Sequence, residues 1–257
     1  MVFAFGVSYD NNKAIFVSTR LCHAILGNAN DFSDLMKENS PTPTIYRELV
    51  KFHVRADRPT FIGNRFRQYL NGKILDVGCD QAVLKGMLGS ELYAGAGMTE
   101  EADVKIDLER EGRLPYDNAS WDTVICLDTL EHLNNLHVMC DELFRVARKH
   151  VIISLPNCWC SARRSLASGS GTIWQYGLTR LPPPDRHKWF FNTEEACAFL
   201  IAQAARPEAS IIILELVALE NRRPLINRLW RRLKYPSRRK YLNLYPHTVV
   251  CVYGIEK

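Results

Sequence analysis

The stretch KILDVGC at residues 73–79 decides the fold class. Its apolar residues are typical of a buried strand, and the strand ends at Gly78, immediately before a helical run over residues 81–88. A strand, a tight turn and a helix start in this order bring backbone N–H groups and the positive end of a helix toward a polar ligand. Many parallel-sheet proteins begin in this way, so the stretch predicts a ligand-binding turn without identifying the ligand.

From residue 73 onward, short β-branched runs alternate with helical segments. This alternation predicts βαβ units and a mainly parallel sheet in an α/β protein. The expected strands are residues 73–79, 92–98, 104–108, 123–128, 150–155, 211–219 and 248–253. The expected helices are residues 45–53, 61–70, 81–88, 135–148 and 193–205, the last with Asn192 or Thr193 as its N-cap.

Two further segments are expected to accompany this domain, which should cover residues 45–257. Residues 1–44 are expected to form an N-terminal extension, in which β-prone stretches at 2–9 and 14–19 flank the turn-forming sequence Asp-Asn-Asn-Lys. Residues 157–190 interrupt the alternation with Gly, Ser and three consecutive prolines. Because they follow the fifth strand, we expect them to form a lid insertion over the carboxyl edge of the sheet.

The 257 residues suffice for one large α/β domain, and a hydrophobic content of 47% provides a core, which excludes disorder of the whole chain. No apolar run reaches the roughly 18 to 20 residues that span a bilayer. The first residues also lack the positive start of a secretory signal. We therefore expect a soluble, cytoplasmic protein.

The eight cysteines include no CxxC pair, and most lie in apolar runs where cysteine packs as a small hydrophobic residue. We therefore expect reduced thiols. Cys158 and Cys160 form the closest pair, but no second pair of soft ligands follows at a zinc-like spacing. This spacing predicts no metal site.

Residues 222–240 hold nine Lys or Arg and no acid, although the whole chain has a net charge of only +5. The positive charge is therefore local and predicts an anionic partner or substrate surface. Apolar residues recur at helix spacing within this segment, namely Leu225, Ile226, Leu229, Trp230 and Leu233. The pattern is typical of helices that lie on anionic membranes, and a plain amphipathic helix packed on the domain is the other interpretation.

Six stretches together are similar to a known family. They are LDVGC (75–79), YAGAGM (93–98), VKIDLE (104–109), LPYDNASWDTVICLDTLEHL (114–133), ELFRVARKHVIISLPN (142–157) and RHKWFFNTEEACAFL (186–200). In this order they resemble the S-adenosylmethionine-dependent methyltransferases of the type 11 small-molecule family, and residues 114–133 are the most specific part. The resemblance covers about residues 73–205. It implies a Rossmann-like methyltransferase fold with a mostly parallel seven-stranded sheet and helices on both faces, and S-adenosyl-L-methionine as the cofactor.

The resemblance also implies cofactor contacts at the carboxyl ends of several strands. Asp76 and Gly78 would lie beside the methionine end of the cofactor, where a carboxylate can receive its ammonium group. Asp107 would accept a hydrogen bond from the adenine amino group, and Leu108 would flank the adenine. The remaining implied cofactor-binding residues are Cys79, Asp80, Gly97, Met98, Asp128, Leu130 and Glu131.

The chain departs from the family pattern at two places. Asp80 and Ala82 stand where the family usually has a second glycine and a third small residue, and Asp80 would either repel the methionine carboxylate or pair with its ammonium. Gly97 stands where the second strand usually ends in an acid that holds both ribose hydroxyls. Losing that pair of charge-assisted hydrogen bonds would weaken binding by about 2 to 4 kcal/mol. Glu100 or Glu101 in the next loop can take the place of that acid.

Methyl transfer from a sulfonium is an in-line displacement, so the protein mainly aligns the nucleophile and excludes water. A hydroxyl acceptor also needs a base, and His132 and His187 are the candidate catalytic residues because imidazole titrates near neutrality. Ordinary structural roles compete with these assignments: Asp76 as a helix cap, Asp128 as a turn residue and His132 as a satisfied helix histidine.

The implied function is methyl transfer to a small-molecule or lipid- or glycan-linked acceptor, for which the basic segment favours an anionic group and contact with the membrane periphery. An alternative, raised by Gly97 and Asp80, is a catalytically inactive methyltransferase-like binding module. A nucleic-acid methyltransferase is disfavoured, because the fourth strand ends in Leu-Asp-Thr-Leu and not in a Pro-Pro-aromatic sequence. A dinucleotide dehydrogenase is disfavoured because Asp80 and Val83 occupy glycine positions of the GxGxxG motif.

Overall fold

The computed structural model describes residues 50–52, 57–89, 91–181, 183, 186–219, 230, 233–235 and 237–256. The predicted hairpin and linker within residues 1–44 lie outside the described residues, as does most of the basic segment. The predicted domain boundary after residue 44 therefore stays a prediction.

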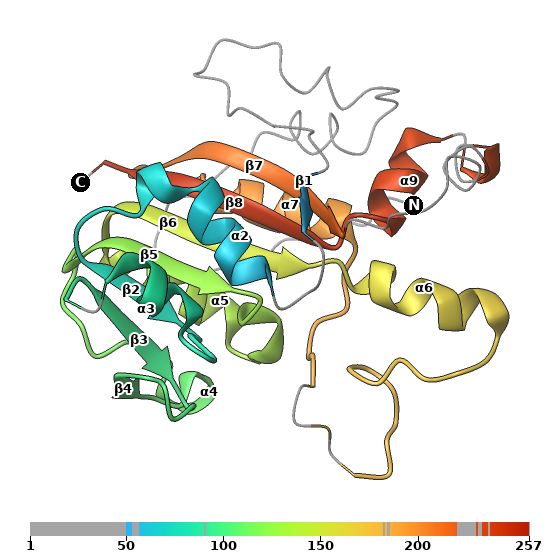
Figure 1. Cartoon of the computed structure of the whole chain (residues 1–257), viewed down its shortest axis with the longest axis horizontal. Coiled ribbons are helices and arrows are strands. Elements are labelled where there is room, and N and C mark those ends of the chain that lie inside the picture. The colour runs from blue at the N-terminus through green and yellow to red at the C-terminus, as the bar shows by residue number, and fades with distance from the viewer. Residues whose placement is uncertain are drawn as a thin grey trace, which may run out of the picture. The chain divides into compact units, whose positions relative to one another are not determined.

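A single sheet of eight strands forms the centre of the domain, in the order β1-β7-β8-β6-β5-β2-β3-β4 (Figure 1). The strands are β1 Val50–Phe52, β2 Ile74–Val77, β3 Tyr93–Gly97, β4 Val104–Lys105, β5 Trp121–Leu127, β6 Ala147–Pro156, β7 Ala209–Leu219 and β8 Thr248–Ile255. All neighbours pair in parallel except β8, which runs antiparallel to both β6 and β7. The prediction of a mostly parallel seven-stranded sheet is confirmed, and β1 adds an eighth strand at its edge.

The strand β1 corrects one prediction, because residues 45–53 were expected to be helical. Val50 pairs with Val217 of β7, and the register continues to Phe52 and Leu219. β1 thereby gives residues 217–219 of β7 backbone partners on the outer side of that strand. Pairing with a distant strand therefore outweighs the local helical pattern at residues 50–52.

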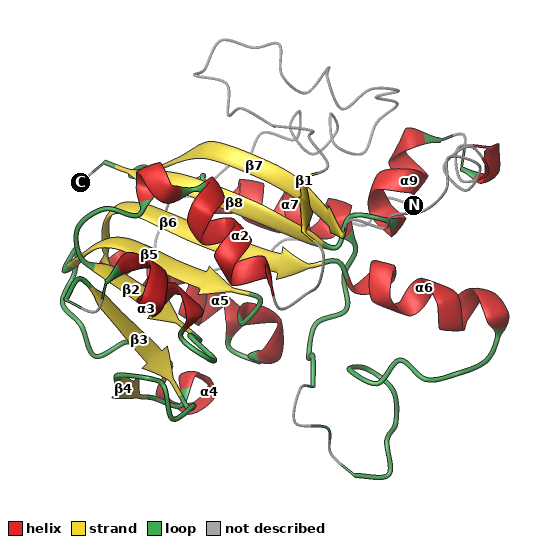
Figure 2. Ribbon diagram, in the orientation of Figure 1, coloured by secondary structure: helices red, strands yellow, loops and turns green. Residues whose placement is uncertain are grey.

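Helices lie on both faces of the sheet (Figure 2). They are α2 Arg58–Arg65, α3 Val83–Leu88, α4 Leu108–Glu111, α5 Leu136–Val146, α6 Cys158–Ser168, α7 Thr193–Gln203 and α9 Arg238–Leu244, with the short 3-10 turns η3 Arg67–Tyr69 and η4 Leu130–His132. Pro59 stands in the first turn of α2, a position that proline tolerates, so this helix begins before the expected start at residue 61.

Alternate residues of the central strands pack on opposite faces, as the pleat of a strand requires. On one face, Ile74, Ile125 and Ile152 join a buried cluster with Ile62 of α2 and Leu84 of α3. The other face forms a second cluster with α5 and α7, which includes Leu75, Val124, Val151, Met139, Leu143 and Leu200. Burial on both faces explains why these strands read as continuous apolar runs in the sequence.

The helix α7 begins with the N-cap that the sequence predicts. The Asn192 side chain accepts a hydrogen bond from the Glu195 backbone N–H at 3.0 Å, and the Glu195 carboxylate accepts one from the Asn192 N–H at 2.9 Å. This reciprocal capping box satisfies two donors at the start of the helix. It also fixes the point at which the lid segment rejoins the domain.

No helix within the described ranges combines the length and the apolar character that crossing a bilayer requires. The described cysteines are not joined by disulfides. Burial raises the pKa of the Cys140 and Cys197 thiols to about 12, so these side chains stay protonated and pack as small apolar groups.

Candidate active site

The turns that follow β2, β3 and β5 are in contact with one another. Gly78, directly after β2, has a φ of +79°, and a Cβ atom built on it would lie 2.2 Å from Thr129 Oγ1, beyond the end of β5. A Cβ atom on Gly97, the last residue of β3, would lie 3.8 Å from the Gly78 Cα. Since these strands are parallel, their carboxyl ends share the edge where open α/β sheets bind ligands.

Asp76 lies near the end of β2 and is buried, with 5% of its surface exposed. Its Oδ2 accepts a hydrogen bond from the Tyr93 hydroxyl at 2.7 Å. Burial raises the pKa of this carboxyl to about 6, and the Tyr93 hydrogen bond only partly opposes the shift. A cationic ligand group would stabilise the charged form, which agrees with the predicted role toward an ammonium.

The residues after Gly78 adopt conformations that usually require glycine. Asp80 has a φ of 43° and Ala82 a φ of 48°, which fits a turn in which the family has small residues. The Asp80 side chain is exposed, and its carbonyl accepts a hydrogen bond from Thr99 Oγ1 at 2.6 Å. Cys79 is buried against Gly95 of β3.

The end of β3 has room for a larger residue than glycine. Gly97 pairs with Lys105 of β4, and a Cβ atom there would meet its nearest neighbours at 3.8 Å, an ordinary van der Waals distance. Met98 is 68% exposed, and Glu100 and Glu101 are both exposed in the following turn. The structure therefore offers no steric reason for a glycine at position 97.

Restoring an acid at this place, as Gly97→Asp, is expected to tighten the binding of S-adenosylmethionine about 30-fold or more, because two charge-assisted hydrogen bonds to the ribose are worth about 2 to 4 kcal/mol. Isothermal titration of both proteins measures the change. Gly97→Asn is the control, since it has the same shape without the charge. Equal affinity of Gly97→Asp and wild type would show that position 97 does not face the ribose.

The two residues expected to contact the adenine, Asp107 and Leu108, form the start of α4. Asp107 caps α4, and its Oδ1 accepts hydrogen bonds from the N–H groups of Glu109 at 3.0 Å and Arg110 at 3.3 Å. Leu108, expected beside the adenine, is 6% exposed and belongs to the core. The other carboxylate oxygen of Asp107, Oδ2, lies 3.4 Å from Arg110 Nε, and the Asp107 side chain is 34% exposed.

Asp128 is buried at the end of β5 with a φ of 44°. Its carboxylate is paired with Arg58 of α2 and accepts hydrogen bonds from Ser154 Oγ at 2.5 Å and Thr248 Oγ1 at 3.1 Å. This network joins α2, β6 and β8 at the carboxyl edge. Asp128 is therefore a turn residue, as one of the predictions had it, and it also holds these elements together through its hydrogen bonds. The sequence did not reveal this second role, because Arg58 is distant in the chain. Leu130, the next predicted contact, is fully buried.

Glu131, His132 and His187 come together beside this corner. One ligand atom from each lies within 4.8 Å of the others. The two imidazole rings meet edge to face, with centroids 4.5 Å apart at an angle of 84°. The lid segment returns here, because the Lys188 N–H donates to the Glu131 carbonyl at 2.8 Å. The structure therefore brings together the two histidines that were expected to act on the acceptor.

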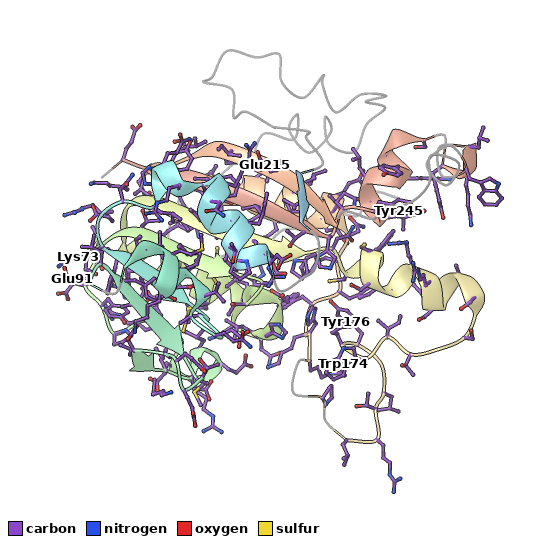
Figure 3. The ribbon with its side chains drawn as sticks, viewed as in Figure 1. Lys73, Glu91, Trp174, Tyr176, Glu215 and Tyr245 are labelled. Atoms are coloured by element: carbon purple, nitrogen blue, oxygen red, sulfur yellow. The ribbon has the colours of Figure 1, made fainter. Side chains whose placement is uncertain are left out.

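The tyrosine Tyr176 positions His187 from within the lid. Its hydroxyl lies 2.7 Å from His187 Nδ1 and donates to Cys158 Sγ at 2.6 Å. Burial raises the pKa of the Cys158 thiol to about 11, so this sulfur is a neutral acceptor. Sequence reasoning did not give Tyr176 this role, because its place depends on how the lid folds back. Figure 3 shows Tyr176 and Trp174 on this segment, away from Lys73 and Glu91 at the other end of the strands.

Residues 86–155 match a family model described as a methyltransferase domain. This stretch is therefore similar to a methyltransferase domain. The fold of this domain resembles a solved S-adenosylmethionine-dependent methyltransferase from Archaeoglobus fulgidus, at 14% identity and a TM-score of 0.52, over 77% of this chain and 93% of that one. The methyltransferase fold predicted from the sequence is thereby confirmed, and the match over residues 86–155 agrees with the predicted type 11 resemblance.

Two further solved structures are similar to the methyltransferase domain. An S-adenosylmethionine-dependent methyltransferase from Mesorhizobium loti matches at 12% identity and a TM-score of 0.46, over 78% of this chain and 98% of that one. The magnesium protoporphyrin IX methyltransferase of Synechocystis PCC 6803 matches at 14% identity and a TM-score of 0.45, over 78% and 81%. No curated protein sequence matches the chain.

A separate cavity of about 480 Å³ lies at the opposite edge of the sheet. Lys73 and Glu91 line it together with Tyr116 and Trp121, all near the amino ends of the strands (Figure 3). The turns after β2, β3 and β5 lie at the carboxyl ends. The cavity therefore does not belong to the site that these turns form.

Proposed function

We propose that the methyltransferase domain binds S-adenosyl-L-methionine at the carboxyl edge of its sheet and transfers the methyl group to a small-molecule or lipid- or glycan-linked acceptor. The observation that carries this proposal is the contact between the turns after β2, β3 and β5, where Gly78 meets both Thr129 and Gly97. The ends of three strands would then contact one ligand, as the cofactor of this family requires. The family match supports the same conclusion.

The proposed contacts follow the order of the strands. Asp76 holds the methionine ammonium, and the Gly78–Asp80 turn offers backbone N–H groups to the rest of the methionine. Gly97 and Met98 lie beside the ribose, and Asp107 reaches the adenine. Leu108, Leu130 and the carboxylate of Asp128 are engaged within the protein, so we assign them a supporting role behind the ligand.

The cofactor supplies an electrophilic methyl group, and the chain's own residues align the acceptor and exclude water. His132 and His187 lie at the acceptor side, where an imidazole can accept the proton of a hydroxyl acceptor. The Trp189 indole donates to the Leu133 carbonyl at 2.7 Å and holds the lid close to η4. The lid thereby keeps both histidines beside the reacting atoms.

An anionic, lipid-linked acceptor is supported by exposed apolar side chains in two segments. Trp174, Leu178 and Leu181 are exposed in the lid, and Trp230 and Leu233 are exposed in the 222–240 segment. Basic residues accompany them in the 222–240 segment. Apolar side chains among positive charges suit the periphery of an anionic membrane, and we propose such contact for a cytoplasmic protein.

Calorimetric titration with S-adenosylmethionine and with its demethylated product tests the proposal. We expect saturable heat for both ligands at one site per chain. NAD⁺ is the control ligand and should give none, because Asp80 and Val83 replace glycines of the dinucleotide motif. The absence of binding at millimolar cofactor would overturn the assignment as an active enzyme.

An inactive binding module is the second candidate, and Gly97 is the observation that favours it. In that case wild type would bind no cofactor, whereas Gly97→Asp would. Nothing in the described residues favours a nucleic-acid substrate. Salt-dependent retention of RNA or DNA in a filter-binding assay would reopen that alternative.

A further inference from the structure

We infer that Glu131, His132 and His187 form a binding site for a divalent transition-metal ion. The inference stands on the geometry of these three side chains and does not depend on the proposed methyl transfer. It corrects the expectation of no metal site, which rested on the spacing of the cysteines.

The spacing of the three side chains is close to that of ligands around one ion. His132 Nε2 lies 3.7 Å from Glu131 Oε1. Nitrogen and oxygen ligands that each lie about 2.0 to 2.2 Å from the same ion are roughly 3 to 4 Å apart. The ligand atom of His187 lies within 4.8 Å of the other two. A movement of about 1 Å in the lid would bring it to the same ion.

The hydrogen bonds of both histidines involve Nδ1 and leave Nε2 for an ion. His132 Nδ1 lies 3.1 Å from the Arg186 carbonyl, which can only accept, so Nδ1 carries the proton. The Tyr176 hydroxyl lies 2.7 Å from His187 Nδ1 and engages that nitrogen. In neutral His132 the lone pair is then on Nε2, and the His187 tautomer with its proton on Nδ1 has the lone pair in the same position. Metal-binding histidines are usually held in this way, with the second nitrogen donating to an oxygen.

Burial and charge also favour a cation at this place. The Glu131 side chain has no exposed surface. A buried carboxylate is costly to keep charged, and a positive ion bound directly to it offsets that cost. The His132 side chain is 27% exposed. This leaves a solvent-accessible side through which an ion can enter and a fourth ligand can bind.

The donor set indicates the class of ion. Two imidazoles and one carboxylate suit Zn²⁺, Fe²⁺, Mn²⁺ or Co²⁺, whereas Ca²⁺ and Mg²⁺ prefer oxygen ligands alone. Three protein ligands with an open position are typical of catalytic ions. If the proposed methyl transfer is correct, the ion would bind the acceptor hydroxyl and lower its pKa, so that its proton passes to water. The two imidazoles would then act as ligands in place of a general base.

Titration of the untagged, chelator-treated full chain with Co²⁺ tests the site, with the visible absorption of the ion and calorimetry as readouts. We expect one ion per chain, and Zn²⁺ should displace it. His132→Ala and His187→Gln should each weaken Co²⁺ binding at least about tenfold. His150→Gln is the matched control, because His150 lies near the start of β6, at the other end of the strands, and should leave the affinity unchanged.

The outcomes separate the two proposals. Co²⁺ binding without cofactor binding would leave the metal site standing and remove the proposed function. The metal site is wrong if wild type does not bind Co²⁺ at one ion per chain, or if His132→Ala and His187→Gln bind it as tightly as wild type. Strong sulfur-to-cobalt absorption would also overturn it, by assigning the ion to cysteines. Circular dichroism of each variant establishes that it is folded. Because the His132 side chain is partly exposed, its substitution should disturb the packing less than substitution of the buried His187.

Discussion

Asp76→Asn is expected to abolish binding of S-adenosylmethionine and, at the same time, to make the folded domain more stable at pH 8. The carboxylate is buried, and its pKa is raised to about 6. An amide cannot attract the ammonium of the cofactor, yet it avoids burying a charge. For the same reason, wild type should bind the cofactor more weakly as the pH falls below 6.

The pH range of the stability effect follows from the pKa shift. An aspartate in the unfolded chain titrates near its ordinary pKa of 3.8, whereas folded Asp76 titrates at about 6. Between these values the folded state keeps a proton that the unfolded state has lost, so the stability of wild type falls as the pH rises. A shift of this size corresponds to about 3 kcal/mol. Since the amide also loses its hydration on burial, we expect a gain of about 2 kcal/mol at pH 8.

Urea denaturation of both proteins at pH 4 and pH 8 measures this gain, which should shrink at pH 4 because wild type is then protonated. Asp117→Asn is the control, since Asp117 is exposed at the opposite edge beside the cavity. It should change neither stability nor cofactor binding. A variant Asp76→Asn that binds the cofactor normally would contradict the role of Asp76 toward the ammonium.

Gly78→Ala is expected to lower the free energy of unfolding by about 2 to 4 kcal/mol, from an unfavourable positive φ and from overpacking. The added Cβ would lie 2.2 Å from Thr129 Oγ1 and 2.4 Å from Thr129 Cγ2, so one of the two turns must move. That movement would also separate the parts of the cofactor site. Urea denaturation and cofactor titration measure the two effects.

The matched control is Gly97→Ala, where the new Cβ has only contacts at 3.8 Å and should change stability by less than about 1 kcal/mol. Adding Thr129→Ala to Gly78→Ala removes both of the closest atoms and should recover part of the lost stability. If the double variant is no more stable than Gly78→Ala, the positive φ of Gly78 is responsible, and contact between the turns is not.

The sequence predicted the positions of the seven main strands because most of them, such as β2, β5 and β6, are apolar on both faces and are bounded by turns. It missed β1, since this strand is specified by its partner β7 and not by its own pattern. It placed His132 and His187 at one site through the family resemblance. The position of Tyr176, and the Arg58 partner of Asp128, depend on tertiary contacts that no local pattern encodes.

The capping role of Asp107 could have been predicted, because an aspartate before Leu-Glu-Arg-Glu is a favourable helix start. The proposed metal site could not have been found from spacing alone. Glu131 and His132 are adjacent in the chain, and His187 reaches them only because the lid returns to η4.

The antiparallel strand β8 has a consequence for synthesis of the chain. It lies between β6 and β7, although it is made after both. While the nascent polypeptide emerges from the ribosome, the backbone groups of β6 and β7 that later pair with β8 therefore have no partner strand. Such edges are prone to intermolecular association. Chaperone binding during translation should accordingly be strongest before residues 248–255 have been added.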